Sequence, residues 1–170
     1  MRPVCDKNGL TEEEFLRRYN PDKYPKPSLT ADIVVFRVTP SGPEVLLIRR
    51  GGHPFLGRLA LPGGFAEAGE TIEATAAREL REETGVTGAD MTLVGVYSAP
   101  GRDPRGWTVS AAFAAVVPAD TEAAAGDDAA ALRWYPLSPA PDGGFTAPLD
   151  EPLAFDHGDI LSDAIRAVFR

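Results

Sequence analysis

The sequence has little of what marks a secreted, membrane-spanning or nucleic-acid-binding protein. Cys5 is the single cysteine among 170 residues, so no disulfide can form within the chain. No apolar run approaches the roughly 18 residues of a membrane-spanning helix, and the charged, proline-rich start lacks the apolar segment of a secretory signal. The net charge of -8 argues against the basic surface that nucleic-acid binding needs. We therefore expect a cytoplasmic protein with no membrane or nucleic-acid partner.

What is present is typical of one soluble globular domain. The chain is 44% hydrophobic and 25% charged, and its length is enough to bury a core without disulfides or metals. The negative charge does not exclude a small anionic substrate, because a local basic patch or a bound cation can reverse the sign of the local field.

The first thirty residues predict a short helix followed by an extended arm. In "TEEEFLRR", Thr11 and Glu14 have the spacing of a capping box. The prolines of "YNPDKYPKPS" then exclude regular helix. We expect residues 1–30 to form this helix and arm and residues 31–170 to form the domain.

The domain alternates apolar strand patterns with two helical patterns. Alanine and leucine recur at helical spacing over 71–84, with Gly85 placed as a C-cap, and 159–169 is amphipathic, with Asp159 as the expected N-cap. β-branched, apolar runs predict strands at 31–38, 45–49, 91–98, 107–117 and 132–137, with a short strand at "LAL" (59–61). This order favours an α/β sandwich with a mixed β-sheet.

Three glutamates crowd one face of the 71–84 helix. Glu79, Glu82 and Glu83 stand at positions i, i+3 and i+4, where like charges repel by a few tenths of a kcal/mol per pair, and a bound cation would reverse that sign. Mg²⁺ takes oxygen ligands and leaves positions for water and substrate phosphates. The alternative is a solvated charged face. Against it, no lysines compensate the glutamates, and a glycine-rich loop leads directly into the helix.

The same stretch resembles the signature of the Nudix hydrolases. That signature is Gly, five residues, Glu, seven residues, Arg-Glu, an aliphatic residue, one residue, Glu-Glu, one residue, Gly and an aliphatic residue. This chain meets it without departure at Gly64, Glu70, Arg78, Glu79, Leu80, Glu82, Glu83, Gly85 and Val86. The flanking segments "YPKPSLTADIVVF", "LLIRRGGHPFLGRLALPGGF" and "YSAPGRDPRGWTVSAAF" resemble the ADP-ribose pyrophosphatase-like branch, with a weaker echo at "FDHGDIL". The resemblance implies a Nudix-type α/β/α sandwich with a mixed β-sheet.

The resemblance also implies roles for the signature residues. The glutamates matching Glu79, Glu82 and Glu83 bind Mg²⁺ or Mn²⁺ in the family, and the carbonyl of Gly63 completes the site. Arg78 is expected to hold Glu79 in place. Glu70 is expected to support the loop and the helix, and the alternative is that it is only a favourable acid near a helix N-terminus. Structural roles are expected for Gly64, at a tight turn, and for Gly85.

The reaction implied is metal-dependent hydrolysis of the pyrophosphate bond of a nucleoside diphosphate linked to another moiety. We expect ADP-ribose as the substrate, with AMP and ribose 5-phosphate as products. The alternatives are a housecleaning nucleoside-triphosphate pyrophosphohydrolase and a non-catalytic regulator that senses ADP-ribose. The regulator reading is disfavoured because the signature is intact and the 33 residues after Leu137 are too few for a DNA-binding domain.

The general base stays open between a signature glutamate and an acid on a later loop. The loop candidates in "TEAAAGDDAA" are Glu122, Asp127 and Asp128, each of which also fits a solvated acidic loop.

Arginines are the expected partners of the substrate phosphates, since their planar donors suit bidentate contact. Arg102 and Arg105 lie in the turn "PGRDPRG" and are expected at the substrate or at a dimer contact. Arg49 is preferred to Arg50 because it matches a position near the phosphates in the family.

The remaining aromatic and imidazole side chains are expected to be structural. Trp107 is read as a half-buried strand residue and Trp134 as core, while His53 and His157 lack the spacing of metal ligands. Relatives of this branch are commonly homodimers, so we expect residues 10–30 to contribute to a dimer interface or to the partner's site.

Overall fold

A computed structural model describes residues 4–126 and 129–169. Its elements are α1 (Glu12–Arg18), β1 (Ser28–Thr39), β2 (Gly42–Arg50), β3 (Leu59–Ala60), β4 (Gly63–Phe65), α2 (Ile72–Thr84), β5 (Met91–Tyr97), β6 (Thr108–Val117), β7 (Ala129–Pro136), β8 (Ser138–Pro139), β9 (Phe145–Thr146) and α3 (His157–Val168). None of the described helices is long and apolar enough to cross a membrane.

The main sheet is built around the parallel pair β1 and β6. Its strands follow the order β3-β2-β1-β6-β5, with β4 also paired to β1 and β7 to β2. β1 and β6 run parallel from Ser28↔Thr108 onward, and the other pairings are antiparallel. The mixed sheet expected from the sequence is therefore confirmed. β1 begins at Ser28, three residues before the predicted strand, because its first residues pair with β6.

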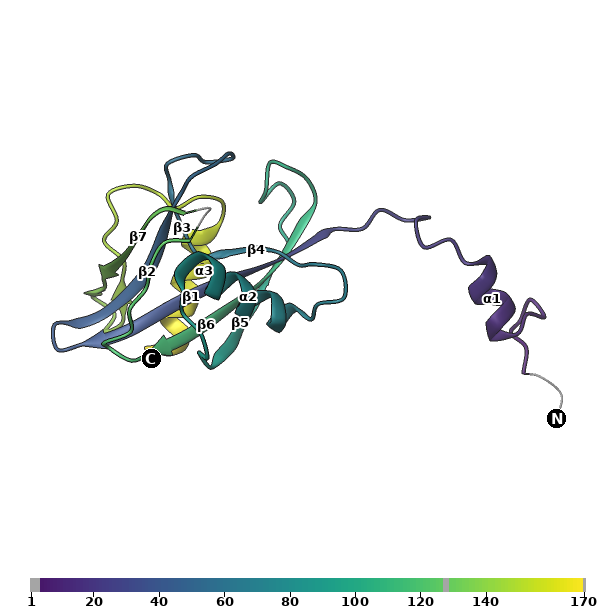
Figure 1. The fold of residues 1–170 in the computed structure, drawn as a ribbon, viewed down its shortest axis with the longest axis horizontal. Helices are drawn as coiled ribbons and strands as arrows, with labels where there is room; N and C mark the ends of the chain where they lie inside the picture. Colours follow the sequence, from purple (N-terminus) through teal and green to yellow (C-terminus); the bar gives the residue numbers. More distant parts are fainter. Residues whose placement is uncertain (1–3, 127–128, 170) are drawn as a thin grey trace.

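Alternating residues of β1 face two separate helices. Ile33 and Val35 belong to a buried cluster with Ala76 and Leu80 of α2. Val34 and Phe36 belong to a second cluster, to which α3 contributes Ile160, Leu161, Ala164 and Ile165. Successive strand side chains point to opposite faces, so α2 and α3 cover opposite faces of the sheet (Figure 1). The α/β/α sandwich is confirmed.

The predicted C-cap of α2 is confirmed, and Thr71, expected as the first helical residue, is the N-cap. The Thr71 hydroxyl accepts the N–H of Ala74, and Gly85 takes the left-handed conformation, with φ 73°, at the C-cap. In α1, Thr11 and Glu14 form the predicted capping box in both directions, with the Glu14 carboxylate accepting the Thr11 N–H at 2.9 Å. Both helix starts therefore follow from local sequence.

The start of α3 differs from the prediction. The helix begins at His157, and Asp159 lies in its first turn instead of capping it. Asp156 occupies the N-cap position but makes no side-chain capping bond, because its carboxylate binds Arg102 instead. A tertiary ion pair replaces the local cap.

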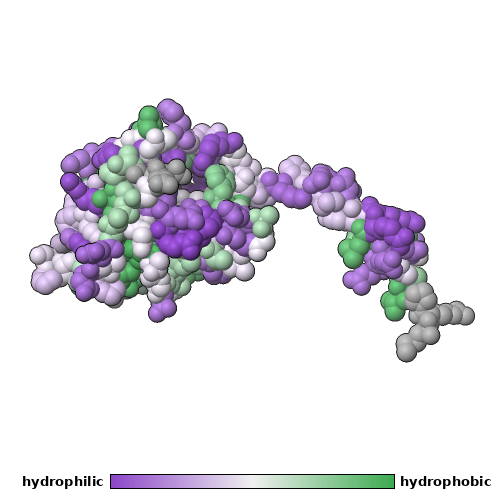
Figure 2. Space-filling model, in the orientation of Figure 1, coloured by the Kyte–Doolittle hydropathy of each residue, from purple (hydrophilic) through white to green (hydrophobic). Residues whose placement is uncertain are grey.

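The N-terminal arm reaches away from the domain, with α1 at its far end (Figure 1). No residue of α1 is buried, and Phe15, Leu16 and Tyr19 are exposed. Figure 2 shows small hydrophobic areas at the far end of an otherwise hydrophilic arm.

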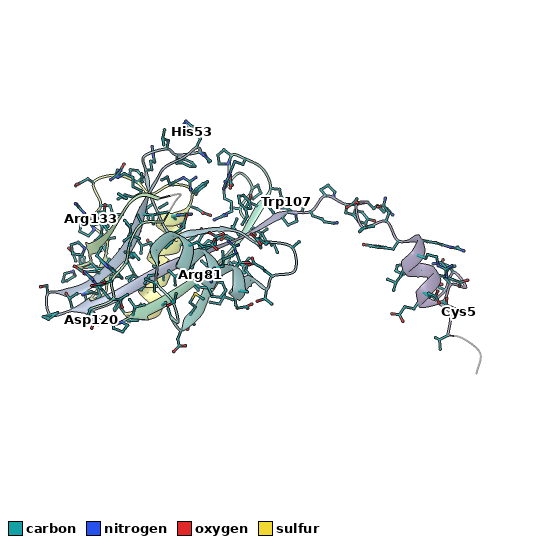
Figure 3. The ribbon with its side chains drawn as sticks, viewed as in Figure 1. Cys5, His53, Arg81, Trp107, Asp120 and Arg133 are labelled. Carbon is teal, nitrogen blue, oxygen red and sulfur yellow. The ribbon has the colours of Figure 1, made fainter. Side chains whose placement is uncertain are left out.

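The two tryptophans differ in burial. Trp107 precedes β6 and is 57% exposed, so its reading as a half-buried strand residue is wrong (Figure 3). Trp134 is partly buried against the α2-side cluster, with the Arg37 guanidinium 4.3 Å from its ring centroid.

Candidate active site

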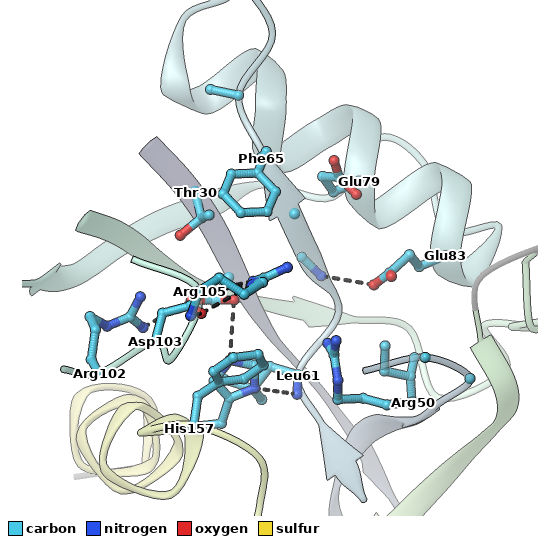
Figure 4. A pocket seen from close by; sticks show the side chains of 18 of the residues that line it. Thr30, Arg50, Leu61, Phe65, Glu79, Glu83, Arg102, Asp103, Arg105 and His157 are labelled. Atoms are coloured by element: carbon cyan, nitrogen blue, oxygen red, sulfur yellow. Dashed lines mark hydrogen bonds and ion pairs between the residues drawn. The ribbon is translucent and has the colours of Figure 1, made fainter. Parts of the chain in front are cut away.

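A cavity of about 650 Å³ lies between α2, the loop after β2 and the N-terminal end of α3 (Figure 4). Its lining includes most of the predicted site residues: Gly63, Gly64, Arg78, Glu79, Glu83, Arg102 and Arg105. Other predicted site residues are absent from this lining: Arg49, Glu70, Glu82 and Gly85.

Glu79 and Glu83 form the acidic wall of the cavity. They are one helical turn apart on α2 and face the β4 strand. The Glu83 carboxylate accepts the N–H of Gly63 at 2.8 Å. Gly64 lies in β4, where a Cβ atom would stand 2.5 Å from the Glu79 carboxylate. Gly64 lies in a strand rather than at the tight turn expected from the sequence, and a side chain there would displace the Glu79 carboxylate.

Arg78 ties the acidic helix to the loop that precedes it. Its guanidinium donates to Glu79 at 2.7 Å, to Glu70 at 2.8 Å and to the Phe65 carbonyl at 2.9 Å. The Arg78 hydrogen bonds, helped by the Glu67 N–H, lower the pKa of Glu70 to about 2. Arg78 thus contacts both Glu79 and Glu70, and the supporting roles expected for Arg78 and Glu70 stay predictions.

Burial raises the pKa of Glu79, although Arg78 works in the opposite direction. A carboxylate that is costly to ionise in this position gains from a nearby cation. The charge environment therefore favours a positively charged ligand beside Glu79.

Glu82 shares the Arg78 guanidinium with Glu79 but does not line the cavity. Its side chain is 49% exposed and pairs with Arg78 and Arg81, both at 3.2 Å. Across residues 4–126 and 129–169, no three acidic, histidine or cysteine side chains gather closely enough to hold an ion. The role of Glu82 as a ligand stays a prediction.

The residues on the cavity wall nevertheless fit Mg²⁺. This ion commonly uses one or two carboxylates and fills its remaining positions with waters and substrate phosphates. Glu79 and Glu83 supply two such carboxylates, and the backbone of Gly63 lines the same space. The donors are all hard oxygens, which suits Mg²⁺ and Mn²⁺.

Arg50 and Arg105 form a basic wall opposite the acids. Figure 4 shows both side chains reaching toward the space bordered by Glu79 and Glu83. Burial, then the positive charge of Arg105, lowers the pKa of Arg50. Asp103 holds the Arg105 guanidinium at 2.7 Å. Two converging cations that repel each other would be relieved by a bound anion, and arginine suits phosphate oxygens.

The other two predicted arginines are engaged elsewhere. Arg102 borders the cavity, but its side chain is only 5% exposed and forms a bidentate pair with Asp156, at 2.6 and 2.8 Å. Burial opposes its charge, but Asp156 and then Asp32 outweigh that effect and raise the pKa of Arg102. Arg49 lies outside the cavity, bonded to Glu151 and to the Gly57 carbonyl. Substrate contact by Arg49 and Arg102 stays a prediction.

Of the three loop acids proposed as general base, Glu122 lies within the described residues. Glu122 is exposed and borders a separate shallow hollow near Gly85 and Trp134. Asp127 and Asp128 lie outside the described residues. The choice of general base therefore stays open.

Three further residues line the cavity although the sequence did not predict them as site residues. Asp32 is buried within β1, where it accepts the Ser110 hydroxyl at 2.5 Å, and a lone acid inside "ADIVVF" was its signal. His157 is buried on the floor of the cavity. His53 is exposed at the rim, in the outer loop labelled in Figure 3.

The chain matches known proteins along most of its length. The family model for the NUDIX domain matches residues 27–160. An ADP-ribose pyrophosphatase from Methanocaldococcus jannaschii is 40% identical over 157 residues, covering 92% of this chain and 83% of the relative. An ADPR-responsive transcriptional repressor, NtrR, from Acinetobacter baylyi is 33% identical, covering 92% of this chain but 60% of the repressor.

Among solved structures, the NUDIX domain of Shewanella oneidensis NrtR, crystallised with ADP ribose, superposes with a TM-score of 0.80 at 31% identity. The match covers 94% of this chain and 99% of that domain. The sequence signature, the sandwich fold and these matches agree, and the chain belongs to the Nudix hydrolase family.

Proposed function

We propose that this chain hydrolyses the pyrophosphate bond of ADP-ribose to give AMP and ribose 5-phosphate, with Mg²⁺ or Mn²⁺ as cofactor. The observation that carries the proposal is the pairing of two walls in one cavity. Glu79 and Glu83 stand on one side, and Arg50 and Arg105 on the other. Such a site suits a cation bound to an anionic pyrophosphate.

The size of the cavity supports a nucleotide-sized ligand. Its volume of about 650 Å³ lies within the range of roughly 300–1,000 Å³ found for small-molecule sites. The relatives named for ADP-ribose favour that substrate over a nucleoside triphosphate.

Each wall then has a chemical task. When bound, the metal would offset charge on the phosphate oxygens and lower the pKa of the attacking water. Glu79 and Glu83 would hold it, with Arg78 fixing the orientation of Glu79 through their 2.7 Å ion pair. Arg50 and Arg105 would bind the phosphate oxygens, and Asp103 fixes the orientation of Arg105. Preorganised charges of this kind supply much of the catalysis of phosphoryl transfer.

The test is a substrate panel with purified protein. ADP-ribose, an ADP-hexose, a dinucleoside polyphosphate and a nucleoside triphosphate are each incubated with Mg²⁺, with Mn²⁺ and with excess chelator. We expect metal-dependent AMP release, highest from ADP-ribose. Pyrophosphate release from the triphosphate in place of AMP release would favour the housecleaning alternative. Binding of ADP-ribose without turnover would favour a sensing role.

We also propose a homodimer that uses the N-terminal arm. Phe15, Leu16 and Tyr19 are exposed on the arm, and β5 is an edge strand that exposes Leu93 and Val96. Exposed apolar groups on an arm and on a sheet edge favour association with a second copy. Sedimentation at micromolar concentration should give a dimer, and an 18.1 kDa monomer would refute it.

The cytoplasmic location and the lack of a nucleic-acid partner stay predictions. The A. baylyi repressor is a regulator by name, and this chain spans 60% of it. Retention of the pure protein on a DNA column at physiological salt would contradict the second prediction, because the net charge of -8 disfavours that binding.

A further inference from the structure

Three consecutive residues at the start of α3 contact three different parts of the cavity. The Phe155 ring lies 5.0 Å from the Arg50 guanidinium and 5.5 Å from that of Arg105. Asp156 binds Arg102. His157 reaches the backbone beneath the acidic wall. This is the "FDH" of the segment "FDHGDIL", to which the proposed chemistry assigns no task.

The imidazole of His157 is buried and bonded at one nitrogen to the main chain. Its Nδ1 accepts the N–H of Leu61 at 2.9 Å, and its Nε2 lies 3.4 Å from the Asp32 carboxylate (Figure 4). Because Nδ1 accepts, the ring hydrogen of the neutral form sits on Nε2 and points toward Asp32. Burial lowers the pKa of His157, which favours this neutral form.

Both residues that the His157 ring contacts, Leu61 and Asp32, are neighbours of Gly63. Leu61 lies two residues before Gly63 on the same segment, and its N–H has a buried side-chain acceptor instead of a strand partner. Asp32 is the residue paired directly opposite Gly63 in the β1–β4 ladder. Gly63 in turn donates its N–H to Glu83, one of the acidic-wall carboxylates.

Gly63 tolerates little displacement. Its φ is +155°, and a Cβ atom there would overlap the backbone carbonyl of Ala31. Gly63 is packed directly against β1, and His157 bonds the same segment two residues earlier, at Leu61. Within the described residues that line the cavity, His157 is the side chain that contacts both Leu61 and Asp32.

We propose that His157 is a positioning residue that sets the main chain at Leu61–Gly63, and through it Glu83, for metal binding. The inference rests on the proposed function, since it assumes that Glu83 and Gly63 belong to the metal site. The Leu61 contact carries this role, because it bonds the segment directly. His157 is not a general base here, since Nδ1 is engaged by the main chain and Nε2 carries the hydrogen.

Two amide substitutions separate the two contacts of the ring. His157→Asn places an amide oxygen near the position of Nδ1 and keeps the acceptor for Leu61. His157→Gln places its amide nitrogen near the position of Nε2 and keeps the donor toward Asp32. His157→Leu removes both. Tyr97→Phe is the control, because the Tyr97 hydroxyl donates to Asp163 at 2.8 Å and ties the same helix to β5 away from the cavity.

The readout is Mn²⁺ affinity, measured by electron paramagnetic resonance on protein without substrate, with unfolding followed in chelator as a check on the fold. Residues that orient metal ligands change affinity by about 10–100-fold when lost. We expect His157→Gln and His157→Leu to weaken Mn²⁺ binding by about tenfold or more. We expect His157→Asn and Tyr97→Phe to stay within about threefold of wild type, because both keep the acceptor for the Leu61 N–H.

The possible outcomes separate the inference from the function on which it rests. Equal losses in His157→Asn and His157→Gln would overturn the role of the Leu61 contact. Full Mn²⁺ affinity in His157→Gln would also overturn it. Wild-type protein that binds no Mn²⁺ would refute the proposed cofactor as well. Wild-type binding with every variant unaffected would refute the inference alone, and turnover of ADP-ribose would still stand.

Discussion

Replacing Glu83 by glutamine tests the acidic wall most directly. The side chain keeps its length and an amide oxygen that can accept the Gly63 N–H, which Glu83 accepts at 2.8 Å. What is lost is the negative charge facing the cavity. Folding and catalysis should therefore respond on different scales.

The structural cost is small. A hydrogen bond to a charged group is stronger than a neutral one by about 1 kcal/mol, so the unfolding free energy should fall by about that amount. For a domain of this size the thermal midpoint should then drop by about 2–4 °C. The catalytic cost is larger, because losing a positioned electrostatic or acid–base group lowers kcat by about 10²–10⁴-fold. That factor corresponds to about 2.7–5.5 kcal/mol in the activation free energy.

The assay is AMP release from ADP-ribose at saturating Mg²⁺, together with thermal unfolding in chelator. Glu73→Gln is the matched control, because Glu73 is an exposed acid in the first turn of the same helix. It should leave kcat unchanged. If Glu83→Gln retains near-normal kcat at saturating metal, the acidic wall is not the catalytic centre.

The remaining predictions address the basic wall, the buried ion pair and pH. Arg105→Ala should raise KM about ten- to a hundredfold and leave kcat unchanged, because it removes one charge-assisted contact of about 1.5–3 kcal/mol. If KM is unchanged and sedimentation shows a weaker dimer, the loop of Arg105 is an interface element instead. Arg102→Ala removes two hydrogen bonds of the Asp156 carboxylate, whose side chain is 19% exposed, and should lower the urea-measured unfolding free energy by about 1.5–3 kcal/mol. A loss below about 0.5 kcal/mol would be incompatible with the pair. The pKa of Glu70 is lowered to about 2 by Arg78, so its stabilisation is present above its ordinary value of 4.5 and is lost as pH falls toward 2. Thermal midpoints across that range should show a smaller acid-side decline in Glu70→Gln than in wild type, and parallel declines would contradict the assignment.

Local features of the sequence were enough to predict the capping box of α1 and to place the start of α2 within one residue. Thr11 with Glu14, and Thr71 at the start of α2, bond within three residues of themselves. Such bonds depend on backbone conformation nearby and not on the rest of the fold. The predicted start of α3 was wrong. The carboxylate of Asp156, at the N-cap position, binds Arg102, a residue far away in the sequence, instead of capping the helix.

The choice between Arg49 and Arg50 in the basic wall also could not be predicted from local sequence. Arg49 and Arg50 are adjacent, and successive strand residues point to opposite faces, so one of them must leave the cavity. The β2–β7 pairing shifts register between these two residues. That irregularity depends on the pairing with β7, and no pattern within "LLIRR" predicts it.

The acidic helix and its loop could be predicted from the sequence, because the spacing of Gly64, Glu70, Arg78, Glu79 and Glu83 is a property of one loop and one helix. The order of strands and helices likewise predicted the mixed sheet. The residues that stand opposite the acidic helix could not be predicted in this way. Arg50, Arg105 and His157 reach the cavity through strand pairing and helix packing, and those depend on contacts between segments that lie far apart along the chain.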